Sequence, residues 1–443
     1  MRIFLGSPGL MSFTGHDFGY LDCLRTALRQ AGHAVNMLGC QRMAPELASR
    51  EGVLPTFSVA TFALQRPAHQ EEILERKAYY TMVTEALRAV PETEALGNVR
   101  KSALRRYDWH AAWVVDSTLQ DIDRLDSSFS LSASDLFIVD AVKSEHMAGL
   151  AEWAAYRLRT AGPNAVPGFA LVLHFDILQG DDGPAVENAY RNVFALIRAS
   201  GLADRFAIFA DTDALTRRFS ALGAMDVVTL PIPHTRHAEA PASRHDGGAP
   251  IVAFVGAGYG EHGFHLLPYV ADRFSGLVAE GRLRFEIQAN LGGAPDEMMS
   301  MAYLALGRMP VTLHRGVLSA ADYYGILARA DICLLPYPGE QFRNQSSGVF
   351  AEAVAFGTVP IVPAGTWMAD IVERHGIGVV FPPSAVEDIH AAIERALAGL
   401  DTLKRRSAAF AENWRRINAP ENYLDVMGRR IGGRSLLDPA FTI

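Results

Sequence analysis

The stretch from Arg343 to Val362, RNQSSGVFAEAVAFGTVPIV, combines hydroxyl-bearing, small and acidic residues in an order that could bind a phosphorylated ligand. Ser346, Ser347 and Gly348 stand in front of an apolar helix that we expect to begin near Gly348. The first N–H groups of a helix lack intrahelical partners and carry the positive end of its dipole. A diphosphate would be held well there, and the glycine would let it approach the backbone. A plain helix capped by serine gives the same pattern, so this alternative stays open.

One carboxylate, Glu352, falls inside this helix among alanine, valine and phenylalanine residues. An unpaired buried carboxylate costs several kcal/mol, so it needs hydrogen-bond donors. A ribose diol would supply two of them when a nucleotide binds. The alternative is a structural ion pair with an arginine from another part of the chain.

The elements that would position these residues alternate between strands and helices. Short apolar runs read as buried parallel strands, and helical patterns separate them. A polar linker over residues 235–249 interrupts the alternation, which then restarts. We therefore expect an α/β protein with a domain at 1–240, a second at 248–415, and a tail at 416–443 that packs back toward the first. Ligands of such sheets bind at the carboxyl ends of the strands, where the Arg343 segment falls.

Composition limits the function classes. The chain has 443 residues and a formal net charge of −8, and its lysines and arginines are scattered, which argues against a nucleic-acid partner. The three cysteines match no metal or disulfide pattern and indicate a reducing compartment. The first residues lack the apolar core of a signal peptide, and no run reaches 18 apolar residues. We expect a cytoplasmic protein without an integral membrane segment, and a peripheral position at the inner membrane stays open.

The run SSGVFAEAVAFGTVPIVPAG resembles the nucleotide-sugar site of retaining GT-B glycosyltransferases of family 4. So do two segments before it, FVGAGYGEHGFHLL and VTLHRGVLSAADYYGILARADICLLPY. The likeness covers roughly residues 250–400, and the N-terminal half matches only in architecture. It implies the GT-B fold, with two Rossmann-like domains facing a central cleft. It also implies a nucleoside-diphosphate sugar as donor, no cofactor and no bound metal. The acceptor, whether a glycan, a lipid-linked molecule or a protein, is left undefined.

The resemblance assigns roles to single residues. The second glutamate of the family's Glu-x7-Glu motif binds the ribose and matches Glu352, whereas the first falls at Asn344, which can still hydrogen-bond a donor sugar. The family's arginine beside the diphosphate falls at Ala257 or a near neighbour, and its lysine falls at His262. Loss of both cations weakens stabilisation of the leaving group.

Three other basic side chains could compensate. A protonated His262 could supply part of the charge, and Arg343 or Arg315 could supply the rest from neighbouring loops. His262 and His265 could also suggest a metal site, but no third ligand is apparent, which agrees with the expected absence of metal.

The N-terminal half offers further candidates. The glycine-rich loop GSPGLMSFTGHD follows the first strand, and in the family this loop approaches the donor phosphate and the acceptor, which singles out Gly15 and His16. His174 ends the strand LVLHF, where the family has a histidine in its catalytic cleft. Either histidine could instead be a structural side chain.

The sequence thus predicts a retaining glycosyltransferase. The expected catalytic residues are His174, His262 and Arg343. The expected substrate-binding residues are Gly15, His16, Asn344, Ser346, Ser347, Gly348 and Glu352. Two alternatives remain: a catalytically silent GT-B protein that senses sugar nucleotides or serves as a partner subunit, and an epimerase of UDP-sugars.

Overall fold

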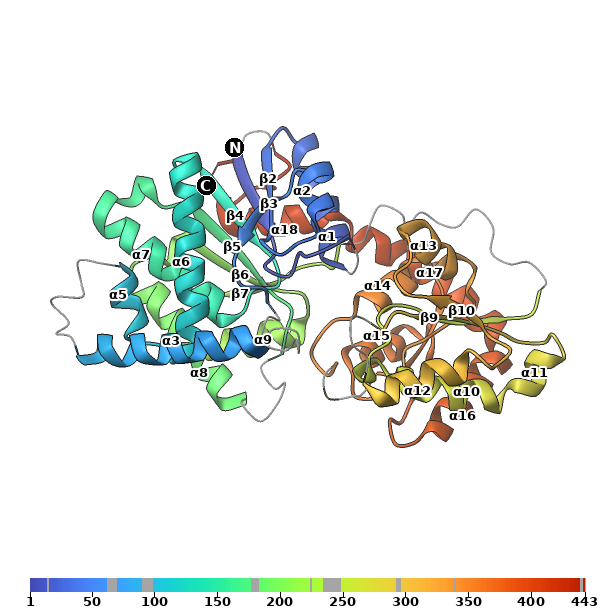
Figure 1. Ribbon diagram of the computed structural model, residues 1–443. Coiled ribbons are helices and arrows are strands. Elements are labelled where there is room, and N and C mark those ends of the chain that lie inside the picture. The colour runs from blue at the N-terminus through green and yellow to red at the C-terminus, as the bar shows by residue number, and fades with distance from the viewer. Residues whose placement is uncertain are drawn as a thin grey trace. The chain divides into compact units, whose positions relative to one another are not determined.

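The computed structural model describes residues 1–13, 16–61, 70–89, 99–176, 183–223, 225–233, 248–291, 296–337, 340, 342–438 and 441–442. The chain divides into two compact units, one made of Met1–Leu230 with Tyr423–Ile443 and the other of Pro231–Asn422. Each unit is described by itself (Figure 1).

The first unit is built on a parallel sheet of seven strands in the order β3-β2-β1-β4-β5-β6-β7. Its strands are β1 (Arg2–Gly6), β2 (Ala34–Cys40), β3 (Leu54–Phe57), β4 (Asp135–Val139), β5 (Gly168–Leu173), β6 (Phe206–Ala210) and β7 (Val227–Thr229). Every residue of β4, β5 and β6 is buried, as expected for strands covered on both faces.

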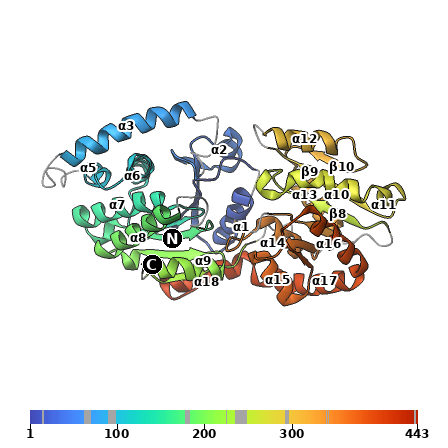
Figure 2. The same ribbon diagram turned by 90° about the horizontal axis from the view of Figure 1, so that it is seen from below.

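The helices of this unit cover both faces of the sheet. They are α1 (His16–Gln30), α2 (Pro45–Glu51), α3 (Gln70–Ala89), α5 (Val99–Leu104), α6 (Trp109–Phe129), α7 (Ser144–Ala161), α8 (Gly183–Ala199), α9 (Asp213–Gly223) and α18 (Pro420–Gly432), with 3-10 turns η3 (Pro163–Ala165) and η4 (Ala203–Arg205). Figure 2 shows α3 beside α5 and α6. Tyr80 of α3 donates to the buried carboxylate of Asp116 on α6 (2.8 Å), which ties α3 to the rest of the unit.

Alternation along β1 sends its side chains to opposite faces. Phe4 joins a core cluster with residues of α6, α7 and α8, whereas Ile3 and Leu5 join a second cluster with α1. The second cluster also holds Tyr423 and Leu424 of α18, so the C-terminal helix completes the core beside the first strand. The sheet is therefore wound on both sides.

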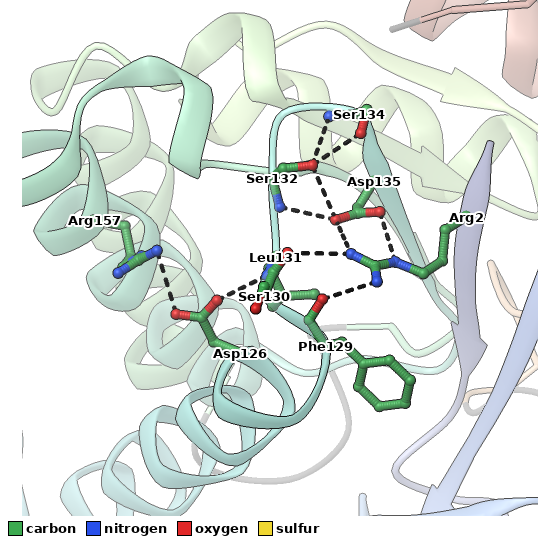
Figure 3. A network of polar contacts seen from close by, with 9 residues as sticks. All are labelled: Arg2, Asp126, Phe129, Ser130, Leu131, Ser132, Ser134, Asp135 and Arg157. Atoms are coloured by element: carbon green, nitrogen blue, oxygen red, sulfur yellow. Dashed lines mark hydrogen bonds and ion pairs between the residues drawn. The ribbon is translucent and has the colours of Figure 1, made fainter.

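At the amino ends of β1 and β4, a polar network joins these strands to the end of α6 (Figure 3). The guanidinium of Arg2 donates through Nε and Nη2 to the carboxylate of Asp135 at 2.8 and 2.6 Å. Its Nη1 donates to the carbonyl of Phe129 (2.8 Å), the last residue of α6. Ser130 then adopts a left-handed conformation with φ 50°, which turns the chain toward β4.

The second unit has a parallel sheet of six strands in the order β10-β9-β8-β11-β12-β13. These are β8 (Ile251–Phe254), β9 (Arg284–Ala289), β10 (Thr312–Arg315), β11 (Ile332–Leu334), β12 (Val359–Pro363) and β13 (Val379–Phe381). The helices are α10 (Leu267–Arg273), α11 (Ser275–Ala279), α12 (Glu297–Leu306), α13 (Ala320–Arg329), α14 (Gly348–Ala355), α15 (Trp367–His375), α16 (Val386–Ala398) and α17 (Leu400–Ile417), with 3-10 turns η5 (Gly260–His262) and η6 (Phe264–Leu266).

Two hydrophobic clusters flank this second sheet, one with α13, α14 and α15 and the other with α10, α12 and α16. The predicted α/β architecture of doubly wound parallel sheets is therefore confirmed. Among the described helices, none has the length and apolar character needed to cross a membrane.

Candidate functional site

The predicted phosphate-binding segment lies at the carboxyl end of β11, where α14 begins. Gly348 is the first residue of α14, as the sequence predicts, and Ser347 is its N-cap. The hydroxyl of Ser347 accepts a hydrogen bond from the backbone N–H of Phe350 (3.2 Å) and is buried. The serine-capped helix is thus present, and it places the positive end of a helix dipole at the ligand-binding edge of a parallel sheet.

Glu352 lies one turn into α14 with only 6% of its surface exposed. Two consecutive tyrosines of α13 donate to its carboxylate: Tyr323 to Oε2 at 2.5 Å and Tyr324 to Oε1 at 3.2 Å. The sequence suggested that a ligand diol or an arginine would donate to this carboxylate. In the structure, two phenol hydroxyls donate to it. The tyrosine pair offsets part of the desolvation cost of the carboxylate.

The charge on Glu352 influences the groups around it. Burial, followed by the carboxylate of Glu352, raises the pKa of Tyr323 well above its ordinary value. Burial and the same carboxylate raise the pKa of the Cys333 thiol to about 12. Both groups therefore stay protonated at neutral pH, and Tyr323 remains a hydrogen-bond donor to the carboxylate.

His262 ends the short turn η5, in the loop after β8. Its Nδ1 is bonded to the carbonyl oxygen of Ala257 (2.8 Å), so Nδ1 carries a proton. The imidazole stacks on the ring of Tyr337, with centroids 4.8 Å apart, and lies 6.0 Å from the ring of Phe342. Tyr337 and Phe342 belong to the segment between β11 and α14, so the two loops that the resemblance joins are neighbours.

The close approach of these loops explains why residue 263 is a glycine. A Cβ on this residue would lie 2.2 Å from the carbonyl oxygen of Pro336, and its φ of 73° also favours glycine. Ala257 pairs with Asn290 beyond the ends of β8 and β9 and so extends the parallel pairing of these two strands.

The other predicted residues of this segment precede α14. Arg343 is exposed, and its backbone N–H donates to the carbonyl of Glu340 (3.3 Å). Asn344 and Ser346 are half-buried. Arg315 ends β10, where its guanidinium donates to the hydroxyl of Tyr303 and lies 5.0 Å from the centre of that ring. Arg315 is exposed, and its guanidinium lies against Tyr303 of α12.

In the first unit, His174 directly follows β5 and lies between two aspartates. Its Nε2 is 2.6 Å from Oδ1 of Asp140, which follows β4, and its Nδ1 is 2.7 Å from Oδ2 of Asp211, which follows β6. Burial alone would lower the pKa of His174, but the two carboxylates outweigh it and raise this pKa well above its ordinary value. His174 is therefore a fixed imidazolium at the carboxyl edge of the sheet.

Two buried tyrosines complete this cluster. The ring of Tyr20 on α1 meets His174 edge to face, and the ring of Tyr423 on α18 meets Tyr20 in the same way, each at 5.8 Å. Burial, followed by Tyr423 and Asp140, raises the pKa of Tyr20 well above its ordinary value. Ala141, next to Asp140, has a φ of 53°, a strained conformation for a residue with a side chain.

Of the two loop residues predicted in this unit, Gly15 lies outside the described residues and His16 is the first residue of α1. Throughout the described part of the chain, histidine, cysteine, aspartate and glutamate form no group of three or more that could hold a metal ion.

No protein-family model matches this chain, and no curated protein sequence matches it significantly. Solved structures do match. A UDP-forming α,α-trehalose-phosphate synthase from Burkholderia xenovorans is 15% identical with a TM-score of 0.60, over 97% of this chain and 98% of that one. A sucrose-phosphate synthase from Thermosynechococcus elongatus is 12% identical with a TM-score of 0.59, over 94% and 95%. A glycosyltransferase from Rickettsia africae is 9% identical with a TM-score of 0.60, over 96% and 95%.

These likenesses extend over nearly the whole chain and establish its fold. The chain has the GT-B fold. At such low identity the likeness fixes the architecture of the two units, and the roles of single residues must be argued from the geometry of each site.

The structure adds site residues that the sequence reasoning missed. Asp140 and Asp211 each come directly after a buried strand, β4 and β6, so a polar residue that follows a short apolar run is the available signal. The consecutive tyrosines at 323 and 324 carried no comparable signal, because their contact with Glu352 depends on how α13 packs against α14.

Proposed function

We propose that this protein is a retaining glycosyltransferase that moves a sugar from a nucleoside-diphosphate sugar to a hydroxyl acceptor. The observation that carries the proposal is the buried carboxylate of Glu352, one turn behind the Ser347-Gly348 start of α14, at the carboxyl edge of a doubly wound sheet. A helix N-terminus suits a diphosphate, and a carboxylate one turn away suits the ribose hydroxyls of the same ligand.

The resemblance to family 4 and the names of the structural neighbours support this reading. One neighbour is a UDP-forming synthase and another is described as a glycosyltransferase. We assign the donor nucleotide to the unit 231–422 and the acceptor to the unit that contains His174. The acceptor itself, a glycan, a lipid-linked molecule or a protein, is not part of the proposal.

In the proposed reaction the acceptor hydroxyl attacks from the face on which the diphosphate departs. Catalysis then depends mainly on stabilising the negative charge of the leaving diphosphate. Ser346, Ser347 and Gly348 would contact the diphosphate through backbone N–H groups, and Asn344 would contact the donor sugar. His262 and Arg343 would provide positive charge. Gly15 and His16 are assigned to substrate binding.

The contacts of His174 argue against a role as general base. Both ring nitrogens are engaged by ionised carboxylates, so the imidazolium has no lone pair with which to accept a proton. We propose that it orders the acceptor edge of the first unit as a fixed charge.

A second candidate is a catalytically silent protein that binds a sugar nucleotide as a sensor or partner subunit. In its favour, the resemblance places Ala257 or a near neighbour and His262 where the family has its two cations, and Arg315 is hydrogen-bonded to Tyr303. An epimerase of UDP-sugars is a further option within the same fold.

A thermal-shift panel of UDP-, GDP-, ADP- and dTDP-sugars tests the donor, because a ligand that binds the folded state raises the melting temperature by mass action. The sugar nucleotide that stabilises the protein is then incubated with and without candidate acceptors. Release of nucleoside diphosphate supports an enzyme, and the anomeric configuration of the product, read by NMR, tests retention. Binding without turnover favours the silent protein, and an altered sugar without acceptor favours the epimerase.

A cytoplasmic site of action belongs to the proposal, with a peripheral position at the inner membrane left to test. Cys23, Cys40 and Cys333 are buried and form no disulfide, which suits a reducing compartment. Fractionation of cells that express the full chain would test the location directly.

A further inference from the structure

We infer that Tyr323 is a positioning residue for nucleotide recognition: its hydroxyl holds the carboxylate of Glu352 ionised and oriented toward the ribose hydroxyls of the donor. The inference rests on the proposed function, because it assumes that Glu352 meets a ribose. It adds a residue outside the α14 segment and predicts how nucleotide affinity depends on pH.

The geometry of the contact carries the inference. The Tyr323 hydroxyl donates to Oε2 of Glu352 at 2.5 Å, a length typical of a strong hydrogen bond to a charged oxygen. Tyr324 donates to Oε1 at a longer 3.2 Å. Each carboxylate oxygen thus has one phenol donor. Since an ionised carboxylate offers about four acceptor sites, two bonds from a ribose diol are compatible with both.

Ring contacts, including one with the end of α14, hold the two tyrosines in place. The rings of Tyr323 and Tyr324 meet edge to face, with centroids 5.2 Å apart. Tyr324 in turn stacks on Phe356, at 5.7 Å and an interplanar angle of 23°. Phe356 is the C-cap residue of α14, the helix that carries Glu352. The carboxylate and its two donors therefore form one packed group, which suits a binding site that must hold its shape.

Several titratable groups face Glu352 from the elements packed against it. Tyr323 and Tyr324 come from α13, Cys333 from β11, and Tyr337 from the segment after β11. From α17, the guanidinium of Arg415 donates to the carbonyl of Ala355 in the same helix as Glu352, α14. The two hydroxyls that reach the carboxylate directly are neutral, so they favour its charged form through hydrogen bonding.

Removal of the Tyr323 hydroxyl should therefore raise the pKa of Glu352 above that in the wild type. A protonated glutamate keeps its shape but loses acceptor strength toward the ribose. Nucleotide affinity should then fall as pH decreases through the raised pKa, whereas the wild type should keep its affinity over the same range. A residue with a merely structural role would lower affinity or stability without this pH dependence.

The test uses isothermal calorimetry on the full chain between pH 5.5 and 8. UDP, GDP and ADP are titrated, each with its 2′-deoxy counterpart, into the wild type and Tyr323→Phe. Tyr107→Phe is the matched control, because Tyr107 also donates to a buried glutamate, Glu152 (3.2 Å), but in the other unit. The ribonucleotide that the wild type prefers is expected to bind Tyr323→Phe about 10-fold more weakly at pH 8, because binding must then order a carboxylate that the wild type already holds in position. The loss should grow toward pH 5.5, and the preference over the 2′-deoxy form should shrink. Tyr107→Phe should bind like the wild type.

If Tyr323→Phe does not fold, Tyr324→Phe provides the second variant, with a smaller change in the same direction because its bond is longer. Two results would overturn the inference alone: wild-type affinity and pH profile in the variant, or an equal loss for ribo- and deoxynucleotides at every pH. A wild type that binds none of the nucleotides would overturn the proposed function and this inference together.

Discussion

Nε2 of His174 lies 2.6 Å from Oδ1 of Asp140. On the other side of the ring, Nδ1 lies 2.7 Å from Oδ2 of Asp211. Because ionised carboxylates only accept hydrogen bonds, both ring nitrogens must carry protons. The sequence singled out this histidine for catalysis, and the geometry restricts what it can do: it is a charge held by β4, β5 and β6 together.

This charge predicts how the stability of the first unit depends on pH. The pKa of His174 is raised well above its ordinary value of about 6.5 by the two aspartates, against the effect of burial. The resulting stabilisation is fully present below about pH 6.5 and is lost as pH rises through the folded-state pKa, by about 1.4 kcal/mol per pH unit between the two values. Urea titrations between pH 6 and 9 should show this decline in the wild-type free energy of unfolding.

Removing the imidazolium should abolish that decline. His174→Gln leaves the buried carboxylates of Asp140 and Asp211 without the positive charge between them and should cost about 3–5 kcal/mol at pH 6.5. His33→Gln is the control, because the ring of His33 is buried but bonds a carbonyl, that of Leu436, rather than a carboxylate. A His174→Gln variant with wild-type stability and an unchanged pH slope would show that His174 is not charged in the folded protein.

A second prediction concerns the network at the amino ends of β1 and β4. Asp135→Asn removes the charge that Arg2 pairs with and should lower the free energy of unfolding by about 1–3 kcal/mol. The expected loss is modest because the Arg2 side chain is 30% exposed and therefore partly screened by solvent. Thermal unfolding monitors the change, and nucleotide binding should be unaffected. Loss of nucleotide binding without loss of stability would contradict a structural role.

Much of the fold could be predicted from local sequence patterns. Contacts that depend on strand order or helix packing could not. The apolar runs of β4, β5 and β6 are long enough to identify as buried strands, and Ser347-Gly348 marks the start of α14. The short strand β3 is not recognisable from the sequence, because LPTF has only four residues and contains a proline. Asp140, His174 and Asp211 become one cluster only through the strand order, which periodicity does not specify. The contact between Tyr323 and Glu352 likewise depends on helix packing.

A third prediction tests the ribose assignment of Glu352. Glu352→Gln preserves the shape of the side chain but weakens its acceptance of hydroxyl protons, so nucleotide affinity should fall roughly 10-fold or more, from about 1.5–3 kcal/mol for a hydrogen bond to a charged group. Calorimetry with the preferred nucleoside diphosphate measures this. Glu152→Gln, a change of the same kind at a buried glutamate of the other unit, should leave the affinity unchanged. Unaltered binding by Glu352→Gln would remove the ribose assignment.

A fourth prediction tests the diphosphate position at the start of α14. Gly348→Val should obstruct the approach of a ligand to the backbone while keeping the fold, because Gly348 already has helical geometry that valine can adopt. Binding of the nucleoside diphosphate should weaken much more than binding of the nucleoside, and the melting temperature should change little. A variant that binds the diphosphate as tightly as the wild type would place the phosphates elsewhere.

The last prediction tests whether catalytic turnover depends on His262. Its Nδ1 donates to the carbonyl of Ala257, so Nε2 is the nitrogen that gains and loses a proton. Negative charge on the leaving diphosphate grows in the transition state, so a cation at this position assists the reaction more than it assists binding. His262→Ala should therefore lower kcat by about 100-fold and change nucleotide affinity less.

Replacement of His262 by lysine distinguishes the effect of the positive charge from that of the imidazole ring. An ordinary histidine is charged only below about pH 6.5, whereas a lysine is charged throughout the physiological range. His262→Lys should keep turnover and flatten the pH profile of kcat above about pH 7. It gives up the stacking on Tyr337, so some loss of stability is expected, and a melting curve accounts for it. Normal turnover by His262→Ala would mean that other groups stabilise the leaving diphosphate, and Arg343 and Arg315 would then be the next residues to replace.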